Sequence, residues 1–223
     1  MMTARVDRDA RGLLNGVMAD RDRDVQAFFQ AWSGTYDMPF YQDGLYGPLH
    51  RVLHDRASVL ARRGRMKVAV DVGIGTGQSL GWLPAVADCV VGVDLSVQML
   101  ALAQTRRPPT AVLVRASAAA LPLPDAAVDL VVSCFSMHWW PDIARGWREL
   151  FRILRPGATA LVLVPSSSLL ALPAFRAALG RAQLVRWLPP GEYAAMARAA
   201  GLATRLPRNV YAGSWLLEGR RPV

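Results

Sequence analysis

The sequence predicts an α/β fold: a doubly wound, mostly parallel sheet of seven strands, with a helical cap at its N-terminal end. Two observations carry this prediction. Runs of valine, leucine and alanine alternate along the 223 residues with amphipathic stretches of about ten residues, as strands alternate with crossover helices. The first run, Val68–Val72, leads into glycines at 73, 75 and 77, which is typical of a loop at the carboxyl end of a parallel strand.

The chain is expected to have two parts that form one compact unit. Residues 1–62 are expected to be a helical segment that caps the site, and residues 63–223 the main domain. In the first part, four apolar residues share one face at helical spacing: Val25, Phe28, Phe29 and Trp32. A second helical pattern covers His50–Leu60. The aromatic side chains fit either core packing or a cap over a ligand.

The strands are expected at Val68–Val72, Val90–Asp94, Ala111–Val114, Val128–Cys134, Thr159–Val164, Ala203–Leu206 and Gly213–Leu217. The helices are expected at Gln78–Ala87, Ser96–Arg106, Ile143–Leu154, Leu170–Leu179 and Glu192–Ala200. Right-handed crossovers place the carboxyl ends of parallel strands on one edge. The glycine loop, Asp94, Ser117 and Ser133 should therefore meet in one cleft at that edge.

Composition narrows the classes of function. The net charge of +9 comes almost wholly from arginines spread along the chain, so nucleic-acid binding is not expected. Cys89 and Cys134 lie in apolar runs and are expected to be free thiols. No apolar run approaches the roughly 20 residues of a membrane span, and no signal pattern precedes the domain. We expect a cytoplasmic protein without a metal, present as a monomer or homodimer.

The glycine loop alone does not identify its ligand. Gln78 stands where a dinucleotide loop has its last glycine, and no lysine follows as in a triphosphate loop. Asp94 ends the second strand about twenty residues later, where an acid can accept hydrogen bonds from two ribose hydroxyls. Asp94 could instead cap the next helix.

Four segments, in this order, carry a family resemblance: Val70–Gly77, Val91–Leu100, Ala120–Val131 and Leu154–Gly157. Together they resemble the class I S-adenosylmethionine-dependent methyltransferases, in particular the small-molecule group that includes the ubiquinone and menaquinone enzymes. The resemblance covers about residues 35–165. It implies a Rossmann-like sheet, S-adenosyl-L-methionine as cofactor, S-adenosyl-L-homocysteine as product, and no metal.

The resemblance also implies roles for individual residues. Asp71 would hold the amino group of the cofactor's methionine portion, directly or through water, and Asp94 would bind the ribose hydroxyls. Leu95 and Met99 would pack beside the adenine. The full set of implied cofactor-binding residues is Asp71, Gly73, Gly75, Gly77, Asp94, Leu95, Met99, Ser117, Ala118 and Ser133.

Ser117 departs from the family pattern, which has an Asp there to accept a hydrogen bond from the adenine amino group. A hydroxyl can still accept that bond, but without the assistance of a charge. The backbone of Ala118 could instead supply most of the adenine recognition. The substitution therefore bears on the affinity for the cofactor and not on its identity.

The candidate catalytic residues are His138 and Tyr36. His138 follows the fourth strand and is a candidate base, although it could instead pack in the turn or contact the acceptor. Tyr36 resembles an aromatic residue that closes over the methionine end of the cofactor, or it is a core tyrosine. Trp139, Trp140 and Trp187 are expected to line or cover the acceptor pocket.

The sequence thus predicts methyl transfer to oxygen, nitrogen or carbon of a small organic acceptor, in secondary-metabolite or quinone-type biosynthesis. Two alternatives stay open: a non-catalytic accessory or binding protein with this fold, and an RNA methyltransferase. Against the latter, Ser133–Ser136 stands where nucleic-acid amino-methyltransferases usually have an Asn/Asp-Pro-Pro-aromatic run.

Overall fold

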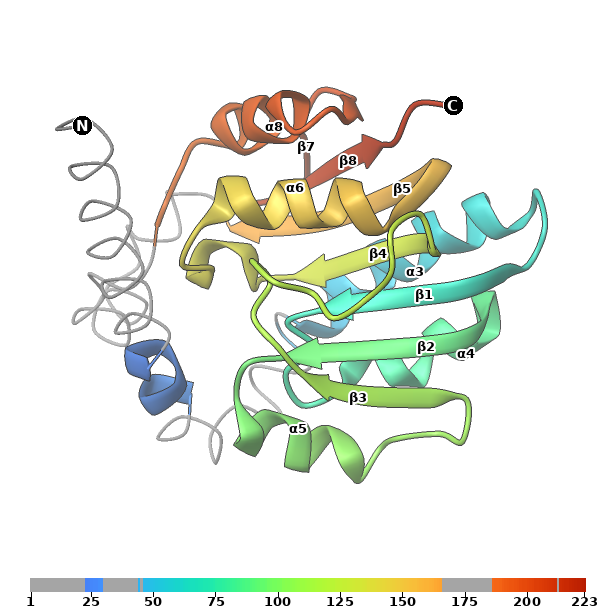
Figure 1. Ribbon diagram of the computed structural model, residues 1–223, viewed down its shortest axis with the longest axis vertical. Coiled ribbons are helices and arrows are strands. Elements are labelled where there is room, and N and C mark those ends of the chain that lie inside the picture. The colour runs from blue at the N-terminus through green and yellow to red at the C-terminus, as the bar shows by residue number, and fades with distance from the viewer. Residues whose placement is uncertain (1–22, 30–43, 45, 166–185, 212) are drawn as a thin grey trace, which may run out of the picture.

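The computed structural model describes residues 23–29, 44, 46–165, 186–211 and 213–223, and it contains a mostly parallel sheet (Figure 1). Eight strands form the sheet: β1 (Met66–Val72), β2 (Ala87–Asp94), β3 (Ala111–Arg115), β4 (Val128–Cys134), β5 (Leu154–Pro165), β6 (Ala203–Thr204), β7 (Arg208–Tyr211) and β8 (Ser214–Arg220). The α/β class and the parallel core are confirmed. The sheet has one strand more than the seven expected. The additional strand is β7, which is short and pairs only with β8 among the described strands.

The strand order is β3-β2-β1-β4-β5-β8-β6. The first five of these strands in the order run parallel, and β8 is antiparallel to its neighbours. The order reverses direction between β1 and β4, and such a switch point is where open α/β sheets bind ligands outside the carboxyl ends of the strands. In Figure 1 those ends point left, toward the helical segment 23–29.

Helices cover both faces of the sheet. On one face α6 (Ile143–Ile153) and α8 (Pro190–Ala199) pack against alternating strand residues such as Val70 and Val131. On the other face α3 (Gly47–Ala61), α4 (Leu83–Val86) and α5 (Val97–Gln104) pack against residues such as Ala69 and Leu130. Because side chains alternate along a strand, each buried strand feeds both cores.

Helix α3 belongs to the second of these cores. Its inward residues Leu49, Leu53 and Ala57 are fully buried, as the apolar spacing indicates. The expected division of the chain near residue 62 stays a prediction. Within residues 1–62, α3 covers a sheet face, whereas the segment 23–29 lies at the carboxyl edge.

The expected helix over 78–87 is replaced by two short pieces, the 3₁₀ turn η2 (Gln78–Gly81) and α4. Gly81 and Pro84 explain the break, because glycine weakens a helix and proline lacks the N–H that continues one. The inward residues Leu80, Leu83 and Val86 are nevertheless buried, as expected. The chain then enters β2 three residues earlier than the apolar run alone suggests.

Side-chain caps fix the two helices that flank the site. The Ser96 hydroxyl accepts a hydrogen bond from Met99 N at the start of α5, and the Asp142 carboxylate accepts one from Arg145 N at the start of α6. The expected helix over Leu170–Leu179 lies outside the described residues. Within the described part of the chain, no helix has the length and apolarity needed to cross a bilayer.

Candidate functional site

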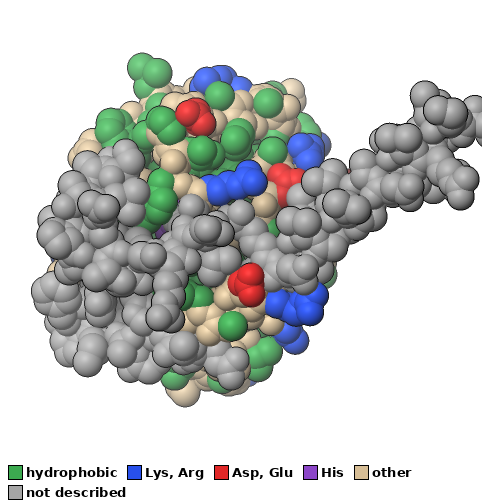
Figure 2. All heavy atoms as spheres, turned by 90° about the vertical axis from the view of Figure 1, so that its left-hand side faces the viewer, with side chains coloured by type: hydrophobic (Ala, Val, Ile, Leu, Met, Phe, Trp, Pro, Cys, Tyr) green, Lys and Arg blue, Asp and Glu red, His purple; other side chains and the backbone are tan. Residues whose placement is uncertain are grey.

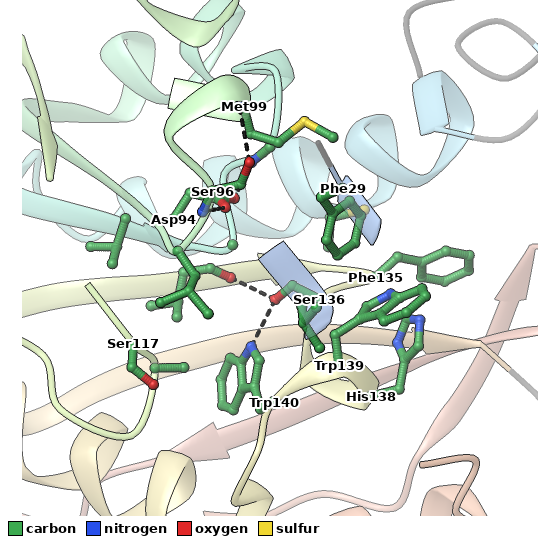
Figure 3. Close-up of a pocket in the computed structure, with 18 of the residues that line it drawn as sticks. Phe29, Asp94, Ser96, Met99, Ser117, Phe135, Ser136, His138, Trp139 and Trp140 are labelled. Carbon is green, nitrogen blue, oxygen red and sulfur yellow. Dashed lines mark hydrogen bonds between the residues drawn. The ribbon is translucent and has the colours of Figure 1, made fainter. Parts of the chain in front are cut away.

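A pocket opens at the carboxyl edge of the sheet, beside the switch point between β1 and β4 (Figure 3). Its walls come from the glycine loop, the ends of β2 and β4, the residues after β3, the turn η3 (Met137–Trp139) and the helical segment 23–29. Among the described residues that line it, Asp94 is the one acidic side chain, and no lysine or arginine takes part. The pocket is therefore mainly apolar, with one anionic position.

Backbone geometry explains the glycines of the loop after β1. Gly73 and Gly77 have φ of 82° and 89°, a region that residues with a Cβ rarely adopt. A Cβ on Gly73 would lie 2.2 Å from the Cβ of Ser136, and one on Gly77 would lie 3.1 Å from the Cα of Ala103. Gly73 and Gly75 line the pocket, whereas Gly77 packs against α5.

Asp94 ties the glycine loop to the next helix. One carboxylate oxygen accepts a hydrogen bond from Gly75 N at 2.8 Å, and the other accepts one from Ser96 N at 2.9 Å. Burial raises the pKa of Asp94, and the backbone N–H donors partly offset that effect. Each oxygen keeps a second lone pair, so the carboxylate can also accept bonds from ligand hydroxyls in the pocket.

Asp71 is buried near the carboxyl end of β1 and does not itself line the pocket, whereas the next two residues, Val72 and Gly73, do. Its side chain is only 2% exposed, and its Oδ1 has no hydrogen-bond partner among the described residues. Burial raises the pKa of Asp71 to about 7, the nearby Ser79 hydroxyl partly offsets this rise, and the charge of Asp94 adds to it. A buried acceptor without a partner is costly, and a cationic group that reached it would relieve that cost.

Leu95, Met99, Ser117 and Ala118 all line the pocket, and their contact with an adenine stays a prediction. The Ser117 hydroxyl accepts a hydrogen bond from Ala119 N at 3.3 Å. One of its two acceptor positions is therefore used within the loop that contains it. Figure 3 shows Met99 and Ser117 at different margins of the cavity, with Ser96 and Asp94 on the Met99 side.

Aromatic rings form the opposite wall. Trp139 stacks on Phe28 with ring centroids 4.9 Å apart, and it meets Phe29 edge to face at 5.0 Å. These contacts join the segment 23–29 to η3, and Val25, Gln26 and Phe29 of that segment line the pocket. The contacts support the role of this segment as a cap.

His138 lies within this aromatic wall. Its side chain is 4% exposed, and its ring centroid lies 5.5 Å from that of Trp139 and 5.3 Å from that of Trp187. Burial lowers the pKa of His138 to about 3, and its Nδ1 has no partner among the described residues. The imidazole is therefore neutral over the physiological range and a weak proton acceptor.

The predicted placement of Ser133 in the cleft is wrong, because Ser136, three residues later, reaches the pocket in its place. Ser133 is fully buried and does not line the pocket, whereas Ser136 does. Phe135, between them, has φ of 52°, an uncommon value for a residue with a side chain. This turn of the backbone brings Ser136 beside Gly73.

The three remaining predicted site residues differ in whether they reach the pocket. Trp140 lines the pocket, whereas Trp187 contacts His138 without being a lining residue, and Tyr36 lies outside the described residues. Lining residues that sequence reasoning did not single out include Tyr46, Ala116, Cys134, Phe135, Ser136 and Pro165. Ala116, Cys134, Phe135 and Ser136 are chain neighbours of the predicted Ser117 and Ser133 at strand ends, whereas Tyr46 and Pro165 carry no motif signal. Cys89 and Cys134 are free thiols, as expected.

The residues present fit an adenosyl amino acid. The orphaned Asp71 oxygen suits an ammonium group, Asp94 suits a pair of hydroxyls, and the apolar residues around Met99 suit a planar base. Within the described ranges, no group of three or more His, Cys, Asp or Glu side chains is arranged to hold a metal ion.

Comparisons with known proteins bear on the family and the fold of the chain. Residues 70–162 match the family described as "Methyltransferase domain". A malonyl-[acyl-carrier protein] O-methyltransferase from Marinomonas is 34% identical over 139 residues, which cover 60% of this chain and 49% of that protein. A demethylmenaquinone methyltransferase from Roseiflexus is 36% identical over 100 residues, which cover 43% of this chain and 41% of that protein. The match thus spans about half the length of these relatives or less.

Solved structures share the fold at low identity. A chain from the complex of the Haloferax volcanii Trm112 methyltransferase activator with a methyltransferase has a TM-score of 0.71 and 20% identity, over 87% of this chain and 98% of that one. The [4+2]-cyclase SpnF has a TM-score of 0.61 and 20% identity, over 76% of this chain and 82% of that one. Residues 70–162 of the chain are thus similar to a methyltransferase domain, and the relatives that match this region are named as methyltransferases, among them S-adenosylmethionine-dependent ones.

Proposed function

We propose that this protein transfers a methyl group from S-adenosyl-L-methionine to a small, neutral, largely apolar acceptor. Two observations carry the proposal. Asp94 is the one acidic residue among the described residues that line the pocket, and Asp71, buried directly behind the lining residues Val72 and Gly73, has a carboxylate oxygen, Oδ1, without a hydrogen-bond partner among the described residues. The relatives named as methyltransferases support the same assignment.

The protein's own residues would bind and orient the cofactor. Asp71 would hold its ammonium group, and Asp94 its ribose hydroxyls. Leu95 and Met99 would contact the adenine, with Ser117 and Ala118 beside its amino group. When bound, the cofactor supplies a methyl group activated by a sulfonium, so the protein's main tasks are orientation and the exclusion of water.

The acceptor would occupy the aromatic side of the pocket. Phe29, Phe135 and Trp139 offer apolar faces there, and no described lining residue is cationic. An acceptor with a strong negative charge would find no counterion among those residues, and burial of an unpaired charge is costly. This favours a neutral acceptor with an aromatic or other apolar ring, attacked at oxygen, nitrogen or carbon.

His138 is better suited to position the acceptor than to remove a proton from it. A pKa of about 3 gives the imidazole little driving force as a base. Its buried Nδ1, which has no partner among the described residues, can form a hydrogen bond with a polar group of the acceptor. A base role for His138 would require an acceptor that raises this pKa on binding.

The direct test is a methylation screen. The purified protein is incubated with S-adenosyl-L-methionine and a panel of neutral phenols, hydroquinones and amines, with carboxylates of matched size as the contrasting set. Mass spectrometry should find products that carry one added methyl group among the neutral ring compounds. Turnover confined to carboxylates would contradict the acceptor class. Binding of the cofactor without methylation of any compound would favour the non-catalytic alternative.

RNA methylation is a weaker candidate. Figure 2 shows the face of the molecule at the carboxyl edge of the sheet. Where described residues are visible there, basic side chains (blue) and acidic ones (red) are scattered among hydrophobic ones (green). A nucleic-acid surface would instead gather positive charge along a face. The comparisons do not favour this alternative, and the small-molecule assignment stands as our proposal.

A further inference from the structure

The Ser136 hydroxyl joins two parts of the pocket that lie far apart in the sequence. Its Oγ is 2.8 Å from the carbonyl oxygen of Val72, at the start of the glycine loop, and 3.1 Å from the indole Nε1 of Trp140. It is also 2.7 Å from the Oγ of Ser133. Figure 3 shows Ser136 in the middle of the cavity, bonded on both sides.

The directions of these bonds follow from the chemistry of a hydroxyl, which has one donor and two acceptor positions. A carbonyl oxygen can only accept, so Ser136 donates its one proton to Val72. An indole N–H can only donate, so Trp140 donates to Ser136. Ser133 must therefore donate the third bond. All the hydrogen-bonding capacity of Ser136 is used within the protein.

Steric fit adds a second constraint at the same point. The space that a Cβ of Gly73 would need is filled by the Cβ and Oγ of Ser136, at 2.2 and 2.4 Å. The positive φ of Phe135 directs the next residue into this space. The loop after β1 and the turn after β4 are thus fitted to each other, and Ser136 is the point of contact.

We propose that Ser136 is a positioning residue that holds the glycine loop in register with the Trp140 wall, so that cofactor affinity depends on its hydroxyl. This inference rests on the proposed function. Ser136 has no free donor or acceptor for the cofactor, so its effect would pass through Val72 and the loop. The hydroxyl would also link the cofactor loop to the side of the pocket formed by Trp140.

The test compares two serine-to-alanine variants three positions apart. Ser136→Ala removes the donor to Val72 and the acceptor of Trp140. Ser133→Ala is the matched control, because it removes a buried hydroxyl that bonds Ser136 and leaves the other two bonds in place. Calorimetry with S-adenosyl-L-homocysteine gives the affinity without the need for an acceptor, and thermal unfolding gives the stability.

We expect Ser136→Ala to weaken S-adenosyl-L-homocysteine binding about tenfold, and Ser133→Ala by less than about threefold. Ser136→Ala should also lower Tm more, because it removes three hydrogen bonds whereas Ser133→Ala removes one. The indole N–H signal of Trp140 in a ¹⁵N spectrum, identified by its absence in Trp140→Phe, should move upfield in Ser136→Ala. A purely structural role would lower Tm in both variants without this difference in affinity.

Equal affinity in Ser136→Ala and the wild type would overturn the inference, as would equal weakening in the two variants. If Ser136→Ala does not fold, Ser136→Cys replaces it in the comparison, because a thiol keeps a weak donor and acceptor. Affinity for S-adenosyl-L-homocysteine between that of the wild type and a tenfold loss would support the inference, and wild-type affinity would overturn it. A wild-type protein that does not bind S-adenosyl-L-homocysteine would instead refute the proposed function itself.

Discussion

Asp71 is the most deeply buried acidic side chain in the described part of the chain. Its pKa of about 7 lies above the ordinary value of 3.8 because burial penalises the charged form. The folded protein therefore holds this proton more tightly than the unfolded chain does. The contribution to the free energy of unfolding is complete below about pH 4 and is lost as the pH rises toward 7.

Ligand binding should show the opposite dependence. An ammonium group pairs with the ionised carboxylate, so affinity for S-adenosyl-L-homocysteine should rise about tenfold between pH 6 and pH 8, as the ionised fraction of Asp71 increases. Calorimetry across this range measures the effect. Adenosine, which lacks the ammonium group, should show no such rise, and Asp71→Asn should abolish it. A flat profile for S-adenosyl-L-homocysteine would contradict the role of Asp71.

Some residues of the pocket could be predicted from the sequence, and others could not. Gly73 and Asp94 lie in continuous motifs whose spacing follows from the strand, the loop and the next strand, so their place at the pocket could be predicted. Ser136 and Tyr46 reach the pocket through contacts between segments distant in sequence. Nothing in the local pattern around Phe135 indicates its positive φ, which directs Ser136 to the loop.

At the scale of elements, the capped helices agree with expectation, whereas segments that contain glycine and proline differ. Strand β5 begins at Leu154 and not at Thr159, so it includes the expected turn Arg155–Gly157. Helices α5 and α6 begin at their predicted positions because Ser96 and Asp142 cap them. The segment after the glycine loop breaks in two, because Gly81 and Pro84 outweigh its apolar spacing. Strand β7 was missed because its four residues carry no clear alternation and it pairs only with β8.

The helical segment 23–29 is the element whose role in binding is most open to test. Arg115 at the end of β3 donates hydrogen bonds to Gln26 Oε1 at 3.2 Å and to the carbonyl of Leu95 at 3.3 Å. Phe28 and Phe29 contact Trp139 on the other side. The segment is thus attached on both sides of the pocket, as a cap that retains a ligand would be.

Phe29→Ala should therefore speed the release of S-adenosyl-L-homocysteine roughly two- to tenfold, because an aromatic contact and part of the pocket wall are lost. Stopped-flow displacement measures the release rate. Val59→Ala, which truncates an exposed apolar residue of α3, is the control and should release the ligand at the wild-type rate. Unchanged release from Phe29→Ala would show that the segment does not retain the ligand.

At the scale of the whole molecule, the sheet order explains why these residues meet. The switch between β1 and β4 brings the glycine loop and the Ser136 turn together, and β2 adds Asp94 beside them. The fold alone does not determine the reaction, since the [4+2]-cyclase SpnF shares it. The cofactor could be predicted from the sequence because the residues expected to bind it lie in motifs, whereas the residues proposed to contact the acceptor come from separate segments.

The central claim is that the glycine loop and Asp94 form a binding site for S-adenosyl-L-methionine. Isothermal titration calorimetry of the wild type against Asp94→Ala tests it most directly. Asp88→Ala is the matched control, because Asp88 lies exposed near the other end of β2 in an ion pair with Arg65. We predict that the wild type and Asp88→Ala bind alike and that Asp94→Ala loses at least about tenfold in affinity. Absence of binding by the wild type, or equal binding by folded Asp94→Ala, would contradict the claim.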